Sequence, residues 1–256
     1  LVQPHRQVQA GAGKGDRMSA ALKRILVALL FVPLAALASE GVKLDRAPDR
    51  ATDQAALQNG ARLFVSNCLN CHGASYVRYN RLTEIGLTEQ QIKDNLMFTA
   101  EKIGEPMGIS MPRKDAKEFF GAWPPDLSLI ARSRASGDGS GADWLYTYLR
   151  GFYRDETRPT GWNNIAFPSV GMPHVLWELQ GEQVMGADHK LTLARPGKLT
   201  PKQYDDAVGD LVAFMVWMAE PQAQFRKQLG VAVLLFLAVF FVVAYALKRA
   251  FWKDIH

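Results

Sequence analysis

The chain has 256 residues, with 30 lysines and arginines against 25 aspartates and glutamates, and a formal net charge of +5. The excess lies near the two ends, because residues 39–225 contain 20 basic and 23 acidic residues. This central part is therefore not expected to bind nucleic acid. It is long enough for one domain with a substantial hydrophobic core.

An apolar segment near the amino terminus has the organisation of an export signal. Lys23 and Arg24 precede a continuous apolar stretch, which ends in the small-residue pattern Ala36-Leu37-Ala38. We therefore expect residues 18–38 to be a signal peptide and residues 39–225 to form an exported domain. The stretch is short for an uncleaved membrane anchor. Residues 1–17 precede this signal and are expected to be absent from the mature protein.

Two helices are predicted in the first half of the exported part. Residues 53–67 place apolar side chains at helical spacing and end directly at a cysteine motif. A capping box formed by Thr88 and Gln91 predicts the start of another helix, which we expect to run through Met97 to Ile103.

A third helix is predicted near the end of the exported part. Thr200 and Gln203 form a capping box with Pro201 at the first helical position, and apolar spacing continues up to Pro221. Turn-rich segments separate the helices, and strand-like alternation is scarce. The sequence therefore predicts a mainly α domain with long loops.

The motif after the first helix is Cys68-Leu69-Asn70-Cys71-His72, and these are the two cysteines of the chain. This spacing is the attachment signature of a c-type haem, in which two thiols bind one porphyrin edge and the imidazole reaches the iron. A zinc site would need a further pair of ligands, and a thioredoxin-type redox pair would need a βαβ pattern. A disulfide across two residues would close almost no loop. We predict one covalently bound haem c with His72 as an axial ligand.

The sixth iron ligand should come from one of the long loops. Met172 is favoured, because Pro173 stiffens its loop and the closing helix follows it. Met111, followed by Pro112, is the second candidate, and His174 is the third. The methionines on predicted helices are expected to pack in the core. The remaining loop candidates are Met107, Met185 and His189.

The nature of this ligand decides the chemistry of the site. Ligation by histidine and methionine raises the haem potential, because a thioether favours Fe(II) more than a second imidazole does. With both axial positions filled, the site passes single electrons. An open sixth position would instead indicate a catalytic haem enzyme.

A second apolar segment, residues 229–247, contains no charged residue. At about 1.5 Å per residue, its nineteen residues span the hydrocarbon core of a bilayer. Basic residues lie on both sides of it, so the charge bias alone orients it weakly. We expect residues 226–248 to be a transmembrane anchor in contact with lipid. Residues 249–256 would then form a cytoplasmic tail, with the signal peptide setting this orientation.

Several motifs resemble the cytochrome c1 family, in the same order along the chain and over about residues 39–256. The haem motif is followed by Tyr76-Val77-Arg78-Tyr79. The further motifs are Pro124-Pro125-Asp126-Leu127-Ser128, Arg132-Ser133-Arg134, residues 167–181 and residues 212–221. Residues 167–181 look like the ligand-loop variant of some bacterial members, with Gly171 before Met172 and Pro173-His174 after it.

The resemblance implies a cytochrome c-like haem domain held at a bacterial inner membrane by one helix, with the domain in the periplasm. Cys68 and Cys71 would bind haem c covalently, and His72 and Met172 would ligate its iron. Arg134 corresponds to an arginine at a haem propionate, and Trp144 falls where the family has an aromatic residue near the haem.

The same resemblance implies an electron-transfer subunit of the ubiquinol–cytochrome c reductase (bc1) complex, without catalysis of its own. Its partners would be cytochrome b, the Rieske iron–sulfur subunit and a soluble cytochrome c. The slightly acidic exported domain would attract a basic cytochrome c. Two alternatives stay open: a haem subunit of another respiratory complex, such as a terminal oxidase, and a haem enzyme with an open sixth site.

Overall fold

The computed structural model describes residues 42–253. The expected signal peptide at residues 18–38 and the extra residues 1–17 lie outside the described residues. The described helices are α2 (Gln54–Asn67), η1 (Tyr79–Ile85, a 3-10 helix), α3 (Glu89–Asn95), α4 (Arg113–Phe120), α5 (Ile130–Ser133), α6 (Gly141–Arg150), α7 (Trp177–Gln180), α8 (Pro201–Ala219) and α9 (Ala223–Phe251). The described strands are β1 (Ala74–Arg78), β2 (Pro106–Met107), β3 (Phe152–Arg154), β4 (Trp162–Asn164), β5 (Gly181–Met185) and β6 (Leu191–Pro196).

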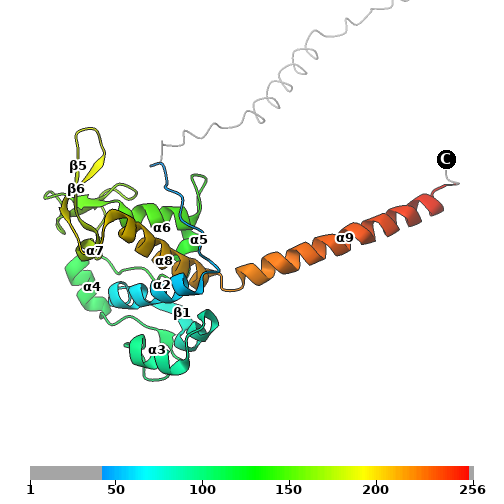
Figure 1. Ribbon diagram of the computed structural model, residues 1–256, viewed down its shortest axis with the longest axis horizontal. Coiled ribbons are helices and arrows are strands. Elements are labelled where there is room, and N and C mark those ends of the chain that lie inside the picture. Colours follow the sequence, from blue (N-terminus) through cyan, green and yellow to red (C-terminus); the bar gives the residue numbers. More distant parts are fainter. Residues whose placement is uncertain (1–41, 254–256) are drawn as a thin grey trace, which may run out of the picture. The chain divides into compact units, whose positions relative to one another are not determined.

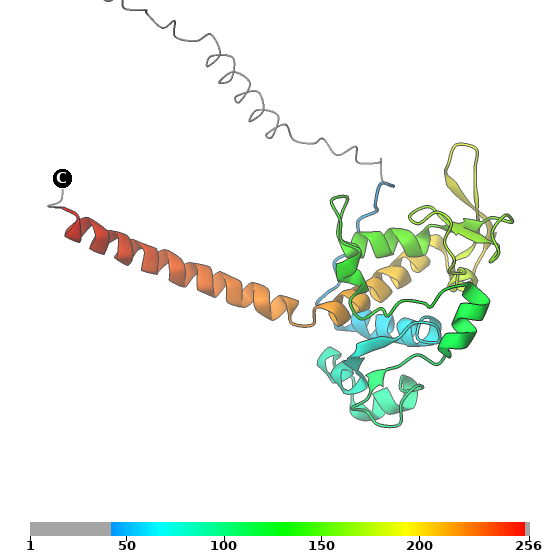
Figure 2. The ribbon, with the colours of Figure 1, turned by 180° about the vertical axis from the view of Figure 1, so that it is seen from behind.

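Helices α2 and α8 form the frame of the haem domain and lie side by side in both ribbon views (Figures 1 and 2). They approach closely at Gly60, where a Cβ atom would overlap the carbonyl oxygen of Asp210 on α8. One turn later, the rings of Phe64 and Phe214 pack with their centroids 5.6 Å apart. Because α2 leads into the haem motif, this crossing fixes the position of that motif.

Local sequence signals account for where each of these two helices begins. The side chain of Asp53 accepts a hydrogen bond from the backbone N–H of Ala56 and caps α2. The capping box of Thr200 and Gln203, with Pro201 next to it, starts α8 as predicted. Buried Tyr204 on α8 donates a hydrogen bond of 2.8 Å to the carbonyl oxygen of Leu149, which attaches α8 to α6.

Helix α3 begins at the predicted capping box but is shorter than the sequence suggests. It ends at Asn95, so the expectation that it runs through Met97 to Ile103 is wrong. The backbone beyond it has other partners, because Asn80 donates its N–H to the carbonyl oxygen of Ile103 at 2.8 Å. Met97 still packs against the hydrophobic core, as expected, but from a loop.

The described strands form three two-stranded antiparallel sheets, which the sequence did not predict individually. β1 pairs with β2, β3 with β4, and β5 with β6. The β5–β6 hairpin projects from the haem domain in Figures 1 and 2. The fold is otherwise helical, and long loops connect its short helices and strands, as expected.

Helix α9 is the apolar C-terminal helix that the sequence predicts. It is 29 residues long, none of its residues is buried, and it is long and apolar enough to cross a membrane. It extends beyond the expected residues 226–248 at both ends, because good helix formers such as Gln224 and Arg249 continue the helix at its flanks.

Candidate haem-binding site

The haem motif forms a tight turn at the C-terminal end of α2. Cys71 and His72 both donate their backbone N–H groups to the carbonyl oxygen of Cys68, at 3.1 and 2.8 Å. The turn brings both sulfurs and the imidazole to the lining of one cavity. Both thiols are free, with Cys68 buried and Cys71 half-buried.

This haem cavity has a volume of about 320 Å³. All six residues predicted for the site line it, although they come from four separate parts of the chain: Cys68, Cys71, His72, Arg134, Trp144 and Met172. Most of the other lining side chains are apolar or aromatic. The cavity therefore has the character of a porphyrin site, apolar around the ring with few polar groups.

The imidazole of His72 is held in one orientation by a backbone carbonyl. Its Nδ1 lies 2.7 Å from the carbonyl oxygen of Pro125. A carbonyl can only accept, so Nδ1 carries the proton and Nε2 keeps its lone pair for a metal. The residues present thus fit the axial ligand that a c-type haem requires.

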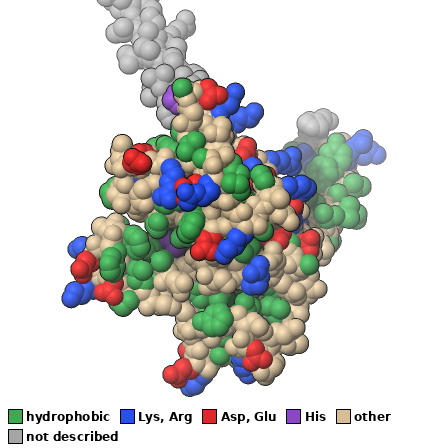
Figure 3. Space-filling model, turned by 60° about the vertical axis from the view of Figure 1, so that its left-hand side comes forward, with side chains coloured by type: hydrophobic (Ala, Val, Ile, Leu, Met, Phe, Trp, Pro, Cys, Tyr) green, Lys and Arg blue, Asp and Glu red, His purple; other side chains and the backbone are tan. Residues whose placement is uncertain are grey.

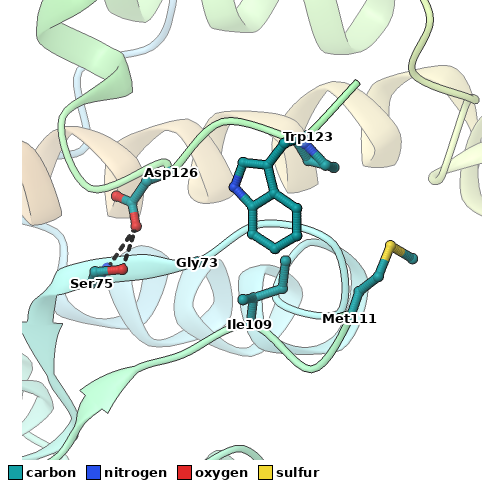
Figure 4. Close-up of a pocket in the computed structure, with 7 residues that line it drawn as sticks. Gly73, Ser75, Ile109, Met111, Trp123 and Asp126 are labelled. Carbon is teal, nitrogen blue, oxygen red and sulfur yellow. Dashed lines mark hydrogen bonds between the residues drawn. The ribbon is translucent and has the colours of Figure 1, made fainter. Parts of the chain in front are cut away.

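The loop that supplies this carbonyl, residues 124–128, is called the proximal loop below, and Asp126 holds it in place. The Asp126 carboxylate accepts hydrogen bonds from the N–H and the hydroxyl of Ser75 at 2.8 and 2.7 Å (Figure 4). It also accepts one from the N–H of Ser128 at 2.8 Å. Leu127 also donates its N–H to the carbonyl oxygen of Gly73 at 2.8 Å. The proximal loop is thereby fixed to the residues that follow the haem motif.

Burial sets the protonation of the ligating groups. Burial lowers the pKa of His72, opposed by its hydrogen bond to Pro125, so the imidazole stays neutral at neutral pH. Burial also raises the pKa of Cys68 to about 12. For Asp126, burial acts to raise the pKa, but hydrogen bonds from Ser128 and Ser75 prevail and hold that pKa below its ordinary value.

Met172 lines the same cavity as the motif and belongs to the ligand loop, defined here as residues 167–175. The hydroxyl of Tyr148 on α6 donates a hydrogen bond to the Met172 sulfur at 3.3 Å. Tyr148 in turn packs its ring on Trp144, with centroids 4.8 Å apart. A thioether is a weak acceptor, so this bond orients the sulfur but leaves it able to bind iron.

Asn164 organises the first part of the ligand loop. It is 1 % exposed, and its side-chain oxygen Oδ1 accepts hydrogen bonds from the N–H groups of Ala166 and Phe167 at 2.8 and 3.2 Å. Its amide donates to the carbonyl oxygen of Tyr148 at 2.7 Å. One buried side chain therefore connects the loop to the helix that carries the tyrosine.

Arg134 and Trp144 form the polar corner of the cavity. The Arg134 guanidinium lies 4.3 Å from the ring centroid of Trp144 and 5.6 Å from that of Phe167. Among the described residues, no carboxylate pairs with it, so a positive charge remains at the cavity edge. This arrangement fits a haem propionate.

The rival ligands lie elsewhere. Met111 lines a second cavity of about 350 Å³, in which Figure 4 shows it near Ile109 and Trp123. Met107 is fully buried in the β1–β2 pair. His174 belongs to the ligand loop and is buried but, within the described part of the chain, is not among the residues that line the haem cavity.

Met185 and His189 belong to the β5–β6 hairpin and its turn, away from both cavities. Met215 on α8 is buried as expected, but it also reaches the haem cavity.

Three contributors to the site were missed from the sequence: Tyr148, Asn164 and the Pro125 carbonyl. Tyr148 follows Trp144 by four residues, which places both on one helix face, so recognising α6 could have found it. Ser140 and Asp143 form a capping box that starts α6. The contacts of Asn164 and Pro125 join distant segments and have no local signature.

Comparison with known proteins agrees with this geometry. Residues 46–255 match the model of the Cytochrome C1 family. The chain is 47% identical to the "Ammonia monooxygenase gamma subunit" of Nitrosomonas europaea, over 92% of this chain and 99% of that protein. It is 42% identical to cytochrome c1 of Allochromatium vinosum, over 92% of this chain and all of that protein.

A third relative is longer than this chain. The "Cytochrome b/c1" protein of Bradyrhizobium diazoefficiens is 30% identical, over 80% of this chain and 34% of its own length. The family match and the identities establish the relationship. The chain belongs to the cytochrome c1 family, whose members carry one covalently bound haem c.

Proposed function

We propose that the chain is a membrane-anchored monohaem cytochrome that passes single electrons within a quinol–cytochrome c reductase complex. One observation carries the proposal: a single cavity brings together two free thiols, an oriented neutral imidazole and a methionine sulfur. These groups are what a haem c with two protein axial ligands needs.

Each residue of the cavity has a defined part in this proposal. Cys68 and Cys71 would attach haem c, which supplies one-electron redox chemistry when bound. His72 and Met172 would occupy the two axial positions and so exclude oxygen or peroxide from the iron. Arg134 would neutralise a propionate, and Trp144 would cover the ring next to it.

The anchor and its orientation follow from α9 and the predicted signal peptide. α9 would cross the bacterial inner membrane once, with residues 39–225 in the periplasm and residues 249–256 in the cytoplasm. Anchoring keeps the haem domain near membrane-bound redox partners, so each encounter becomes effectively intramolecular.

The proposed electron donor is the Rieske iron–sulfur subunit, the proposed acceptor is a soluble cytochrome c, and cytochrome b would share the complex. The name of the Bradyrhizobium relative supports the association with cytochrome b. The face in Figure 3 carries acidic and basic side chains interspersed in small groups. Steering of a basic acceptor by net charge is therefore expected to be modest, and turnover with that acceptor should fall only gently as ionic strength rises.

Purification from detergent-solubilised membranes tests the proposal. We expect this chain to co-purify with b-type haem and an iron–sulfur centre, and its c-type absorption band to be reduced by quinol. An inhibitor that blocks quinol oxidation should abolish that reduction. Co-purification with a terminal oxidase or with a monooxygenase, in the absence of b haem reducible by quinol, would contradict the assignment to a reductase complex.

Carbon monoxide distinguishes an electron carrier from a haem enzyme with an open sixth site. With both axial positions occupied, the reduced protein should not bind carbon monoxide. Rapid carbon monoxide binding by the undenatured protein would show that the sixth position is open.

A further inference from the structure

The proposed haem chemistry assigns no role to His174, which is a buried side chain. It belongs to the ligand loop, two residues after Met172, and is only 2 % exposed. Its Nε2 atom is buried and makes no hydrogen bond of ordinary geometry among the described residues, although the Gln180 side chain lies close enough to interact with the ring. Burying an imidazole nitrogen without a good hydrogen bond costs stability, and the packing of the ring must offset that cost.

The ring packs between two aromatic side chains. It lies parallel to Phe152, with centroids 4.8 Å apart and 5° between the planes. It also meets Trp162 edge-on, at 5.0 Å and 78°. Phe152 and Trp162 are themselves buried and come from the paired strands β3 and β4. His174 is therefore held by buried side chains of the β3–β4 pair and not by its own loop alone.

The side chains that contact His174 and Met172 are themselves neighbours. Tyr148 and Phe152 lie four residues apart, and their rings contact each other at 5.1 Å. Tyr148 holds the Met172 sulfur, and Phe152 holds the His174 ring. Two residues of the ligand loop thus attach to two neighbouring rings of one aromatic column, which fixes the register of the loop.

We infer that His174 is a positioning residue for Met172: its ring, stacked on Phe152, fixes the register of the ligand loop in which the methionine sulfur would ligate the iron of a bound haem. The flat face of the ring performs this task, since the ring is tied to β3 and β4 by its stacking on Phe152 and its edge contact with Trp162. This inference rests on the proposed ligation by Met172, and the experiment below separates the two.

The test compares four variants of the membrane-bound protein with the wild type. In each variant the absorption band of sulfur bound to ferric haem, the midpoint potential and the rate of carbon monoxide binding are measured. Met172→Leu reports on the ligand itself. His174→Phe keeps a flat ring, His174→Leu keeps bulk without a stacking face, and Thr147→Val is the control.

The control variant, Thr147→Val, removes the hydrogen bonds of a buried side chain on α6, the helix that carries Tyr148. This position lies outside the haem cavity. Thr147 accepts a hydrogen bond from the N–H of Asp45 at 2.8 Å and donates one to Asp143. Its loss should lower thermal stability but leave the sulfur band and the potential unchanged. A change in those readouts in the His174 variants is then not a general effect of destabilisation.

We expect His174→Phe to keep the sulfur band and a potential near that of the wild type. In His174→Leu, the population with sulfur off the iron should rise about fivefold, which corresponds to about 1 kcal/mol of lost ring stacking. The potential should then fall, and carbon monoxide binding should accelerate. This variant preserves side-chain volume, so it is expected to fold.

Three outcomes overturn a claim. A His174→Leu variant with wild-type band and potential would refute the positioning role while leaving Met172 as ligand. A His174→Phe variant that loses the band as completely as Met172→Leu would show that a nitrogen of His174 is needed, contrary to the inference. A Met172→Leu variant that keeps the band would refute the proposed ligation itself.

Discussion

The two sides of the haem cavity are held by different kinds of interaction. On the His72 side, several backbone and carboxylate hydrogen bonds fix the proximal loop to residues just after the haem motif. On the Met172 side, one weak hydrogen bond to sulfur and a column of stacked rings hold the ligand loop. The site thus combines a firmly held ligand with one whose position depends on aromatic packing. Changes on the first side should remove the site, whereas changes on the second should tune it.

The largest effect is expected from the attachment residues. Replacing Cys68 and Cys71 together with Ser should leave no haem on the polypeptide after acid–acetone extraction, because thioether bonds can no longer form. Haem staining of the denatured chain measures this. Met111→Leu is the matched control and should retain all haem and an unchanged spectrum. Covalent haem in the double variant would contradict the assignment of the motif.

The next effect concerns the frame beneath the His72 side. Gly60→Ala should lower the free energy of unfolding by about 3 kcal/mol, at the upper end for overpacked cores. The added methyl group would overlap the backbone of Asp210, so α2 and α8 must separate. Thermal unfolding of the haem-loaded protein measures the loss. Gly230→Ala, where a Cβ meets nothing within 4 Å, is the control and should have no such effect.

A smaller effect is expected from the proximal loop. The pKa of Asp126 is lowered in the folded protein, so its contribution to stability is present above the ordinary carboxyl value of 3.8 and is lost as pH falls below it. Asp126→Asn should lower the thermal midpoint at pH 7 and flatten its decline between about pH 4 and 2. Equal slopes in the variant and the wild type would show that Asp126 does not hold the loop.

The smallest effect is expected on the Met172 side. Tyr148→Phe removes the hydrogen bond to sulfur, which makes the sulfur a better donor to Fe(III). The midpoint potential should fall by about 20 mV if that bond contributes about 0.5 kcal/mol. Redox titration measures the shift. Tyr76→Phe, at an exposed tyrosine, is the control and should leave the potential unchanged. A fall as large as that of Met172→Leu would mean that this one hydrogen bond, and not the stacked rings, keeps the sulfur on the iron.

The parts of the fold that could be predicted have local signals. The helix before the haem motif, the helix that starts at Thr200 and the apolar C-terminal helix follow from periodicity, capping and length. The end of α3 could not be predicted, because the backbone at Ile103 pairs with Asn80, far outside the helix. The short strand pairs likewise depend on partners that lie apart in the sequence.

The site divides in the same way. Cys68, Cys71 and His72 are adjacent in sequence, so their spacing alone indicates their chemistry. Met172 could be favoured only from its loop and its order along the chain. The hydrogen bond from Tyr148 and the buried position of His174 arise when β3, α6 and the ligand loop come together. No local sequence pattern predicts that contact.

The closure of α2 against α8 has a consequence for the order of events during maturation. Cys68 precedes α8 by more than a hundred residues, yet in the folded domain it is only 8 % exposed, and burial raises its pKa to about 12. A shielded and protonated thiol reacts poorly with a vinyl group. We therefore expect attachment of the cofactor to begin while the cysteines are still on an open chain, and the domain to close around a ring it already carries.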